Sequence, residues 1–222
     1  MPIKFLIFDS DGTLFDSLKT YTRTFVDMLS APPYNIPPKV SNEFYLQTTG
    51  ESLNVQLMTI LTNQGIESPN IDKLVKKFYT HLSHHDFHLF NDVKEVLPRL
   101  KKYTKIIVSA ADRELLYNRL RSLRMIEVFD FVYGVDSHTP NKEAALEKIE
   151  NYVSGFSRDL AMLVGDGKYD MQLANKNGFV SVGREGTFLR QDLIAAGAQY
   201  TIPDFFELEK ILYKLNGQEQ KI

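Results

Sequence analysis

The chain has 222 residues, of which 43% are hydrophobic and 24% charged, as expected for a globular protein of one large domain or two small ones. Its net charge of −2 argues against general nucleic-acid binding, which needs a basic surface, and the absence of Cys excludes disulfides and thiol catalysis. The N-terminal apolar run is too short for a signal peptide, and no stretch approaches the roughly 20 apolar residues of a membrane span. We therefore expect a cytoplasmic protein with no nucleic-acid or membrane partner.

Short, continuous apolar runs predict strands that are buried on both faces of a parallel sheet. They occupy residues 5–8, 105–108, 131–134, 160–164, 179–182 and 199–202. Segments with helical spacing lie between most of these runs, among them 112–123, 141–153 and 205–215. This alternation predicts a doubly wound, Rossmann-like α/β domain.

The interval between the first two predicted strands, residues 9–104, is far longer than a crossover needs. The proline-rich segment 32–38 reads as a break, and Ser68 and Pro69 as the N-cap and first residue of a helix. We therefore expect a helical module of residues 16–86 inserted into a core of residues 1–15 and 87–222. Helical patterns cover most of the interval, at residues 17–29, 51–64, 68–82 and 92–102.

Two acids, Asp9 and Asp11, follow the first apolar run. Side chains two residues apart on a strand point the same way, so both carboxylates would face one point if the strand reaches them. The sequence "DSDG" (9–12) is equally good β-turn chemistry, so the pair alone does not decide between a site and a turn.

Other polar residues end other runs. Asp166 and Asp170 follow the run 160–164 and share one helix face if a helix begins there, although a glycine-rich turn with an N-cap Asp explains them too. Ser109 ends the run 105–108. Ligands of open parallel sheets bind beyond the carboxyl ends of the strands, and a cluster of acids there needs a hard divalent cation, for which Mg²⁺ is the usual choice.

Four segments together resemble the motifs of the haloacid dehalogenase superfamily in order and spacing, and the inserted helices resemble its helical cap. They are "FDSDGTLFDS" (8–17), Ser109, Lys142 and "GDGKYD" (165–170). Segments 90–112 and 164–187 resemble the phosphoglycolate phosphatase and sugar-phosphatase branch of that superfamily. The resemblance implies a magnesium-dependent phosphohydrolase that cleaves a small phosphorylated metabolite, a phosphomonoester, through a phosphoaspartyl intermediate.

The resemblance also implies roles for individual residues. Asp9 would attack phosphorus, and Asp11 would act first as general acid and then as general base. Lys142 would balance the negative charge. The expected metal ligands are Asp9, the backbone carbonyl of Asp11, Asp166 and Asp170, and the expected phosphate contacts are Ser109 and the backbone N–H groups of Gly12 and Ala110.

Two features of the sequence bear on the assignment of Lys142: Glu143 follows it where the family often has Pro, and Lys168 is a rival cation. A helix with Thr139 as N-cap and Pro140 as its first residue would place Lys142 in its first turn. We expect the Lys142 ammonium nitrogen within roughly 4 Å of Asp9 or Asp166.

Two features of the inserted module have competing interpretations. Thr49, within "QTTGES" (47–52), lies either at a capped helix start or in contact with the substrate. The histidines within 81–88 have the spacing of a helical zinc pair, but a solvated helix end is the better interpretation because no Cys or acidic cluster accompanies them.

Several functional alternatives remain open from the sequence. A phosphomutase of the same family shares every motif, and a non-catalytic regulatory protein could retain the fold. Phosphoglycolate, sugar phosphates and nucleoside monophosphates all fit the motifs as substrates; for a carboxylate on the substrate, Arg23 and Lys39 are the candidate partners. Either a monomer or a homodimer is compatible with the sequence.

Overall fold

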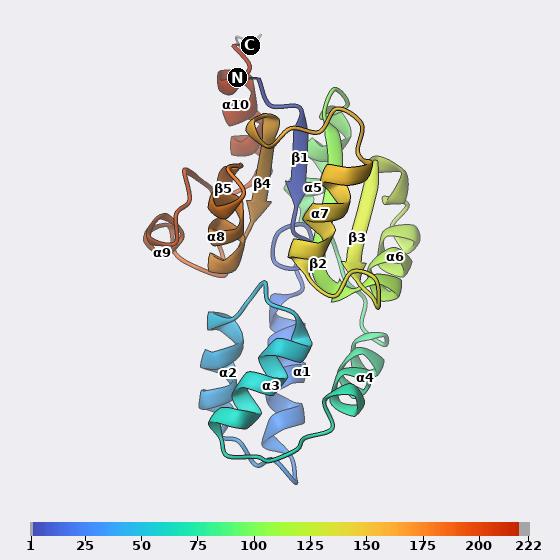
Figure 1. The fold of residues 1–222 in the computed structure, drawn as a ribbon, viewed down its shortest axis with the longest axis vertical. Coiled ribbons are helices and arrows are strands. Elements are labelled where there is room, and N and C mark those ends of the chain that lie inside the picture. The colour runs from blue at the N-terminus through green and yellow to red at the C-terminus, as the bar shows by residue number, and fades with distance from the viewer. Residues whose placement is uncertain (1, 218–222) are drawn as a thin grey trace.

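The computed structural model describes residues 2–217; residues 1 and 218–222 of the expected core lie outside it. Within the described residues, six strands form one parallel sheet in the order β3-β2-β1-β4-β5-β6 (Figure 1). This arrangement confirms the predicted doubly wound α/β fold. The strands are β1 (Phe5–Phe8), β2 (Thr104–Asp112), β3 (Phe131–Val135), β4 (Ala161–Gly165), β5 (Val180–Arg184) and β6 (Tyr200–Ile202).

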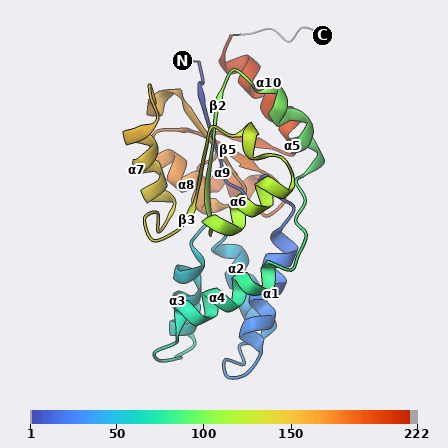
Figure 2. The ribbon, with the colours of Figure 1, turned by 90° about the vertical axis from the view of Figure 1, so that its right-hand side faces the viewer.

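Helices cover both faces of this sheet, which is why its central strands are continuous apolar runs. In β1, Phe8 stacks on Phe205 of α10 on one face, whereas Ile7 packs with Ile149 of α7 and Leu173 of α8 on the other. Figure 2 shows α7 and α8 on one side and α5, α6 and α10 on the other. The bounds are α5 (Asn91–Val96), α6 (Arg113–Ser122), α7 (Lys142–Tyr152), α8 (Lys168–Lys176), α9 (Arg190–Ala195, beside β5 and β6) and α10 (Phe205–Leu215).

The strand order reverses between β1 and β4. From β1 the chain goes to β2 and β3 on one side of the sheet, and it then returns to β4, β5 and β6 on the other. Crossovers diverge at such a switch point and leave a crevice at the carboxyl ends of the strands. Phe8 is paired with Val164, so the residues that follow β1 and β4 begin side by side at this crevice.

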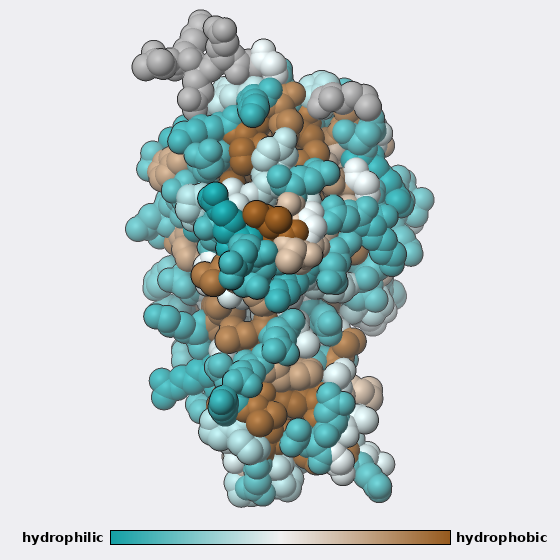
Figure 3. Space-filling model, turned by 90° about the vertical axis from the view of Figure 1, so that its left-hand side faces the viewer, coloured by the Kyte–Doolittle hydropathy of each residue, from teal (hydrophilic) through white to brown (hydrophobic). Residues whose placement is uncertain are grey.

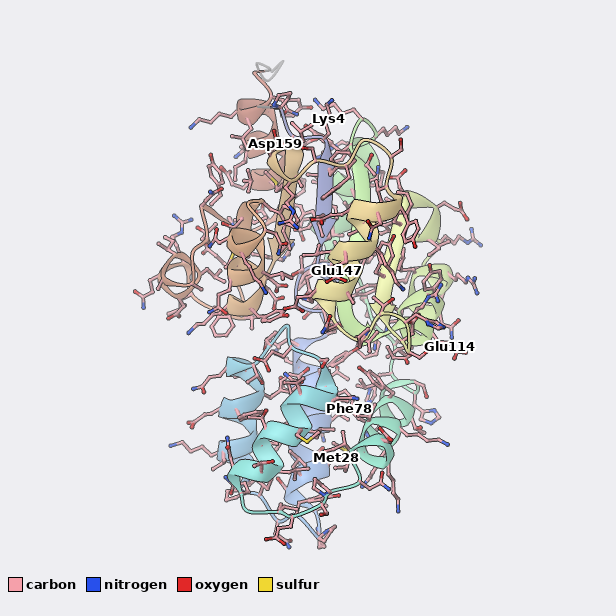
Figure 4. The ribbon with its side chains drawn as sticks, viewed as in Figure 1. Lys4, Met28, Phe78, Glu114, Glu147 and Asp159 are labelled. Atoms are coloured by element: carbon pink, nitrogen blue, oxygen red, sulfur yellow. The ribbon has the colours of Figure 1, made fainter. Side chains whose placement is uncertain are left out.

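A module of helices fills the interval between β1 and α5 and lies beyond the carboxyl end of β1, in the lower part of Figure 1. Its interior contains Phe25, Leu57 and Phe78, and Figure 4 shows the labelled Met28 and Phe78 between the helices. These residues belong to the same apolar cluster as Leu6 and Phe8 of β1, so the interior of the module is continuous with that of the core. Its helices are α1 (Leu18–Ser30), α2 (Pro38–Gln47), α3 (Leu53–Asn63) and α4 (Ile71–Leu82).

Two helix starts in this module differ from expectation. Helix α2 begins at Pro38, which was predicted to be the last residue of the break at 32–38. Proline is tolerated at the first helical position because its missing N–H would have no partner there. Helix α4 is capped by Asn70, whose side chain accepts from the Lys73 N–H at 2.9 Å, so the predicted cap at Ser68 is wrong. Ser68 instead has a φ of 49° and belongs to the turn before the helix.

The helix predicted at residues 92–102 is shorter than expected. Helix α5 ends at Val96 and continues only as a 3-10 turn, Leu97–Arg99. Pro98 has no N–H to donate to the carbonyl of Lys94, so the α-helical ladder cannot continue through it.

The hydropathy of the surface agrees with the proportions of hydrophobic and charged residues in the sequence. The face shown in Figure 3 is mainly hydrophilic, and hydrophobic atoms appear there in separate patches, as is usual for exposed protein surface. None of the helices within residues 2–217 has the length and apolar character needed to cross a membrane.

Candidate active site

Three buried carboxylates gather at the carboxyl ends of β1 and β4. Asp9 directly follows β1, Asp166 directly follows β4, and Asp170 lies in the first turn of α8. One carboxylate oxygen of each lies within 4.8 Å of those of the other two. Because α8 begins only at Lys168, Asp166 is in the loop before the helix, and the condition under which Asp166 and Asp170 would share a helix face is not met.

Lys142 is the cation of this cluster. Its ammonium nitrogen lies 2.6 Å from Asp9 Oδ1 and 2.6 Å from Asp170 Oδ1, and only 2% of its side chain is exposed. The expected contact with Asp9 is therefore present, whereas the rival Lys168 lies over the ring of Phe188. Burial disfavours the charge on Lys142, but the carboxylates of Asp170 and Asp9 more than offset this and raise its pKa, so the lysine remains protonated.

The element that positions Lys142 starts later than predicted. Asn141, and not Thr139, is the N-cap of α7, and its side chain accepts from the Ala144 N–H at 2.9 Å. Lys142 is then the first helical residue, and Thr139 accepts instead from Lys148 Nζ at 2.6 Å. Asparagine is a strong N-cap, and a proline two positions before the helix still fits an extended entry.

The charges of the cluster do not balance within the protein. Three carboxylates face one ammonium, which leaves a formal excess of two negative charges. Burial raises the pKa of Asp9 well above its usual range and that of Asp166 to about 6, and the charge of Asp170 acts in the same direction on both. A compact, buried, carboxylate-rich site with this excess fits a hard divalent cation such as Mg²⁺.

Hydroxyl groups orient one of these carboxylates. Asp166 accepts from Thr13 Oγ1 at 3.1 Å and also from the hydroxyl of Thr187. Such outer contacts fix the direction of a metal ligand. Neither threonine was singled out in the sequence; "GTL" and "EGT" carry no signal beyond their nearness to the acids.

The Asp11 carboxylate does not face the same point as that of Asp9, as it would if the strand reached both residues. Strand β1 ends at Phe8, so the strand alternation does not extend to Asp11. Its Oδ1 accepts instead from Ser17 Oγ at 2.7 Å and from Arg119 Nη1 at 3.1 Å. The Asp11 carboxylate is therefore not part of the group formed by Asp9, Asp166 and Asp170, and the resemblance implies a metal contact through the Asp11 backbone carbonyl instead.

Gly12 has a steric role in this turn. Its φ is +83°, and a β-carbon there would lie 2.1 Å from Asp166 Oδ2, so only glycine lets the turn approach that carboxylate. Its N–H donates to the Phe15 carbonyl at 2.9 Å, so the predicted phosphate contact of Gly12 would have to replace this bond. Among the residues that the structure describes, the N–H groups of Ser10, Asp11 and Thr13 have no such partner, so they are free donors in this turn.

Ser109, Ala110 and Thr49 line one cavity together with Asp9 and Asp11. The Ser109 hydroxyl lies 2.6 Å from that of Ser10, a residue that the sequence analysis did not single out. The Thr49 hydroxyl donates to the carbonyls of Tyr45 and Leu46, so it terminates α2 even though the residue lines the cavity. The interpretation of Thr49 as part of a capped helix start is therefore wrong, because the next helix, α3, has Ser52 at its N-cap position. Contact of Thr49 with the substrate stays a prediction.

Other candidates lie away from this cavity. Arg23 and Lys39 pair with Asp27 and Glu43 on exposed helix faces, each with 85% of its side chain exposed. The rings of His81 and His85 lie 5.6 Å apart, but within residues 2–217 the cluster of Asp9, Asp166 and Asp170 is the group of three whose ligand atoms could hold a metal. The structure thus provides no metal site around the histidines of the described chain.

Comparison with known proteins agrees with this geometry. A protein of Caldanaerobacter subterraneus subsp. tengcongensis that bears the name pyrophosphatase PpaX is 28% identical over 230 residues, which cover 100% of both chains. A phosphoglycolate phosphatase of Aliivibrio fischeri is 28% identical over 189 residues, which cover 79% of this chain and 81% of its own. The crystal structure of a hydrolase from Pseudomonas syringae has the same fold, with a TM-score of 0.77, 22% identity and coverage of 96% of this chain and 99% of its own.

The sequence model of the haloacid dehalogenase-like hydrolases matches residues 6–183, from β1 through the acid cluster to β5. This match contains Asp9, Lys142 and Asp166 together with the whole helical module. It confirms the resemblance drawn from the sequence motifs: the chain belongs to the haloacid dehalogenase-like hydrolase family.

Proposed function

We propose that this protein is a magnesium-dependent phosphatase that hydrolyses a small phosphomonoester through a phosphoaspartyl intermediate on Asp9. The observation that carries the proposal is the position of Asp9: it contacts Lys142 within the buried acid cluster and also lines the cavity. The relatives named for phosphoglycolate and pyrophosphate hydrolysis support phosphoryl transfer as the chemistry.

Asp9 is arranged to act as a nucleophile. Lys142 binds its Oδ1, which leaves Oδ2 to attack phosphorus. The same ammonium favours the ionised carboxylate against the effect of burial. Attack breaks the bond between phosphorus and the ester oxygen, and the leaving alkoxide needs a proton.

Asp11 would supply that proton and later remove one from the attacking water, so that inorganic phosphate leaves and Asp9 is regenerated. Asp11 lines the cavity, and in the arrangement described Ser17 and Arg119 hold its carboxylate there. The Ser109 hydroxyl, the Ala110 backbone and the N–H groups of Ser10 and Asp11 would hold the phosphoryl oxygens.

Asp9, Asp166, Asp170 and the Asp11 carbonyl would hold the magnesium ion. When bound, the ion would offset the excess negative charge and stabilise the charge that develops on the phosphoryl group. Residues 16–86 would act as a cap over the core formed by residues 1–15 and 87–222, because their helices carry one wall of the cavity.

The test is hydrolysis of p-nitrophenyl phosphate with and without Mg²⁺, together with trapping of a phosphoenzyme on Asp9. A phosphomutase would share these contacts, but it needs a second sugar as acceptor. Release of inorganic phosphate in the absence of any sugar therefore separates the two activities. No turnover with any phosphomonoester in the presence of Mg²⁺ would reject the proposal.

A further inference from the structure

The cavity beside Asp9 also has a wall that would face the alcohol part of a substrate. This wall, here called the leaving-group wall, consists of Tyr21, Tyr45, Glu51, Gln56, Phe78 and Tyr79, all from the helical module. The phosphoryl end of the substrate is assigned to the core residues, so selectivity among phosphomonoesters depends on what this wall offers.

The wall offers no positive charge. Its ionisable groups are Glu51 and the three tyrosines, and among the described residues that line the cavity none is Lys, Arg or His. Lys142 lies beneath Asp9 and is held by two carboxylates. The guanidinium of Arg119 lies near the Tyr21 ring, but it donates to Asp11. A carboxylate on the leaving group would therefore meet Glu51 and Asp11 without a free cation.

The three tyrosines are neutral hydrogen-bonding groups. Burial raises the pKa of Tyr21, Tyr45 and Tyr79, and the Asp11 carboxylate adds to the effect in each case. The phenols therefore keep their protons and can donate to an uncharged hydroxyl. Tyr79 is already engaged with the backbone of Asp112.

Tyr21 stands apart from the other two. Its hydroxyl is buried and has no hydrogen-bond partner within residues 2–217. A buried polar group without a partner costs free energy, so its presence on a cavity wall calls for a partner that arrives with a ligand. Gln56, in contrast to Tyr21, already has a hydrogen-bond partner. Its amide donates to the Thr48 carbonyl at 2.9 Å and so holds the turn that carries Thr49 and Glu51.

We propose that the site selects phosphomonoesters whose alcohol is small and hydroxylated and carries no negative charge, and that it discriminates against carboxylated substrates such as phosphoglycolate. This inference rests on the proposed phosphatase activity and narrows its substrate class. Discrimination arises because a negatively charged substrate group would lie near the carboxylates of Glu51 and Asp11 with no cation to balance it. An uncharged hydroxyl can instead form a hydrogen bond with the Tyr21 phenol. The whole cavity, including the part beside Asp9, has a volume of only about 50 Å³, which favours a small substrate.

A series of two-carbon esters tests the charge selectivity with size held nearly constant. The substrates are 2-hydroxyethyl phosphate, ethyl phosphate and phosphoglycolate, compared by kcat/KM in the presence of Mg²⁺. We expect 2-hydroxyethyl phosphate to exceed phosphoglycolate by about tenfold or more, which corresponds to at least about 1.4 kcal/mol. Equal or faster turnover of phosphoglycolate would overturn the inference while leaving the phosphatase activity intact. Failure to hydrolyse any ester, p-nitrophenyl phosphate included, would instead overturn the proposed function and this inference with it.

Tyr21→Phe tests the hydroxyl contact. The variant should lower kcat/KM for 2-hydroxyethyl phosphate several-fold but leave ethyl phosphate nearly unchanged, because ethyl phosphate has no hydroxyl to lose a partner. If both substrates change by the same factor, Tyr21 does not recognise the hydroxyl, and that part of the inference is wrong.

Glu51→Gln tests whether the Glu51 carboxylate repels a carboxylate on the substrate. Removing this carboxylate should raise kcat/KM for phosphoglycolate relative to 2-hydroxyethyl phosphate several-fold. Glu43→Gln is the matched control, because Glu43 is an acid on α2 that pairs with Lys39 and does not line the cavity. An unchanged ratio in Glu51→Gln, or the same change in Glu43→Gln, would contradict the role of Glu51.

Discussion

Lys142 shows how one buried side chain can organise several acids. It contacts Asp9 and Asp170 at 2.6 Å each, although the three residues are far apart in the sequence. A buried ammonium is tolerated because two carboxyl groups lie within hydrogen-bond distance of it. Asp11, in contrast, is paired with Arg119, whose guanidinium lies 3.5 Å from the centre of the Phe87 ring.

Replacement of the nucleophile is the first prediction. Asp9→Asn should lower kcat for p-nitrophenyl phosphate by at least about a thousandfold, because a carboxamide is a poor nucleophile. The fold should persist, since the amide keeps the size of the side chain and its oxygen can still accept from Lys142. Steady-state kinetics and circular dichroism measure the two effects, and near-native turnover would contradict the phosphoaspartyl mechanism.

The second prediction concerns Asp11 and Arg119. Arg119 is 6% exposed, and its Nε and Nη2 have no partner within the described chain, so Asp11→Ala would leave a buried cation unpaired. Because Asp11 is itself 21% exposed, we expect a loss of about 2 kcal/mol in the free energy of unfolding, less than for a fully buried pair.

The double variant Asp11→Ala/Arg119→Met is the control for this interpretation. Methionine would fill the space of the Arg119 side chain beside Phe87 without a charge. It should therefore restore most of the lost free energy of unfolding but none of the phosphatase activity. Denaturant titration measures the recovery, and strictly additive losses would show that the pair is not coupled.

At the scale of single elements, helix starts decide where the functional groups lie. The N-cap Asn141 sets the first residue of α7 and therefore the position of Lys142. The N-cap Asn70 likewise sets the first residue of α4, a helix that contributes no residue to the acid cluster. The two caps accept from backbone N–H groups at the same distance, 2.9 Å, and form a matched pair.

This pair gives the third prediction. Asn141→Ala and Asn70→Ala should each lower the free energy of unfolding by about 1 kcal/mol, the usual cost of a lost cap. Only Asn141→Ala should also lower kcat, because α7 then no longer holds Lys142 against Asp9. Equal activity in the two variants would show that the position of Lys142 does not depend on this cap.

At the scale of the whole molecule, the sheet order brings the acids together. Asp9 and Asp166 are 157 residues apart, yet they follow strands that are direct neighbours. The helical module then covers the same end of the sheet and supplies the leaving-group wall. The acid cluster therefore exists only in the folded chain, so binding of the proposed divalent cation should be linked to folding.

This linkage gives the fourth prediction. The folded state raises the pKa of Asp166 from 3.8 to about 6, mainly by burial, so metal-free folded protein keeps a proton that the unfolded chain has lost. The corresponding stability is fully present below about pH 3.8 and is lost as pH rises through about 6. Mg²⁺ needs the ionised carboxylates, so its stabilising effect should grow over the same pH range.

Thermal unfolding with and without Mg²⁺ measures the effect. At about 100 times the dissociation constant, Mg²⁺ should raise Tm by roughly 5–10 °C near pH 7.5 and by clearly less near pH 5. Asp166→Asn should lose most of this response. A shift that is independent of pH, or that persists in Asp166→Asn, would place the ion elsewhere.

The sequence by itself determined the fold class, the inserted helical module and the identity of the acids. These features depend on local patterns: continuous apolar runs mark buried strands, helical spacing marks the module, and family motifs mark Asp9, Lys142 and Asp166. Helix starts were less predictable, as Asn70 and Asn141 show, because several neighbouring residues were adequate caps and packing chose among them.

Only the tertiary structure decided which groups meet. That Asp170 rather than Asp166 shares Lys142 with Asp9, that Gly12 is needed for its size, and that Asp11 pairs with Arg119 all follow from contacts between distant segments. The leaving-group wall, which carries no cation among the described residues, likewise combines residues from the four helices α1 to α4 and from the turn that carries Glu51. Such contacts depend on sheet order and on the packing of the module against the core, and periodicity along one chain carries no information about either.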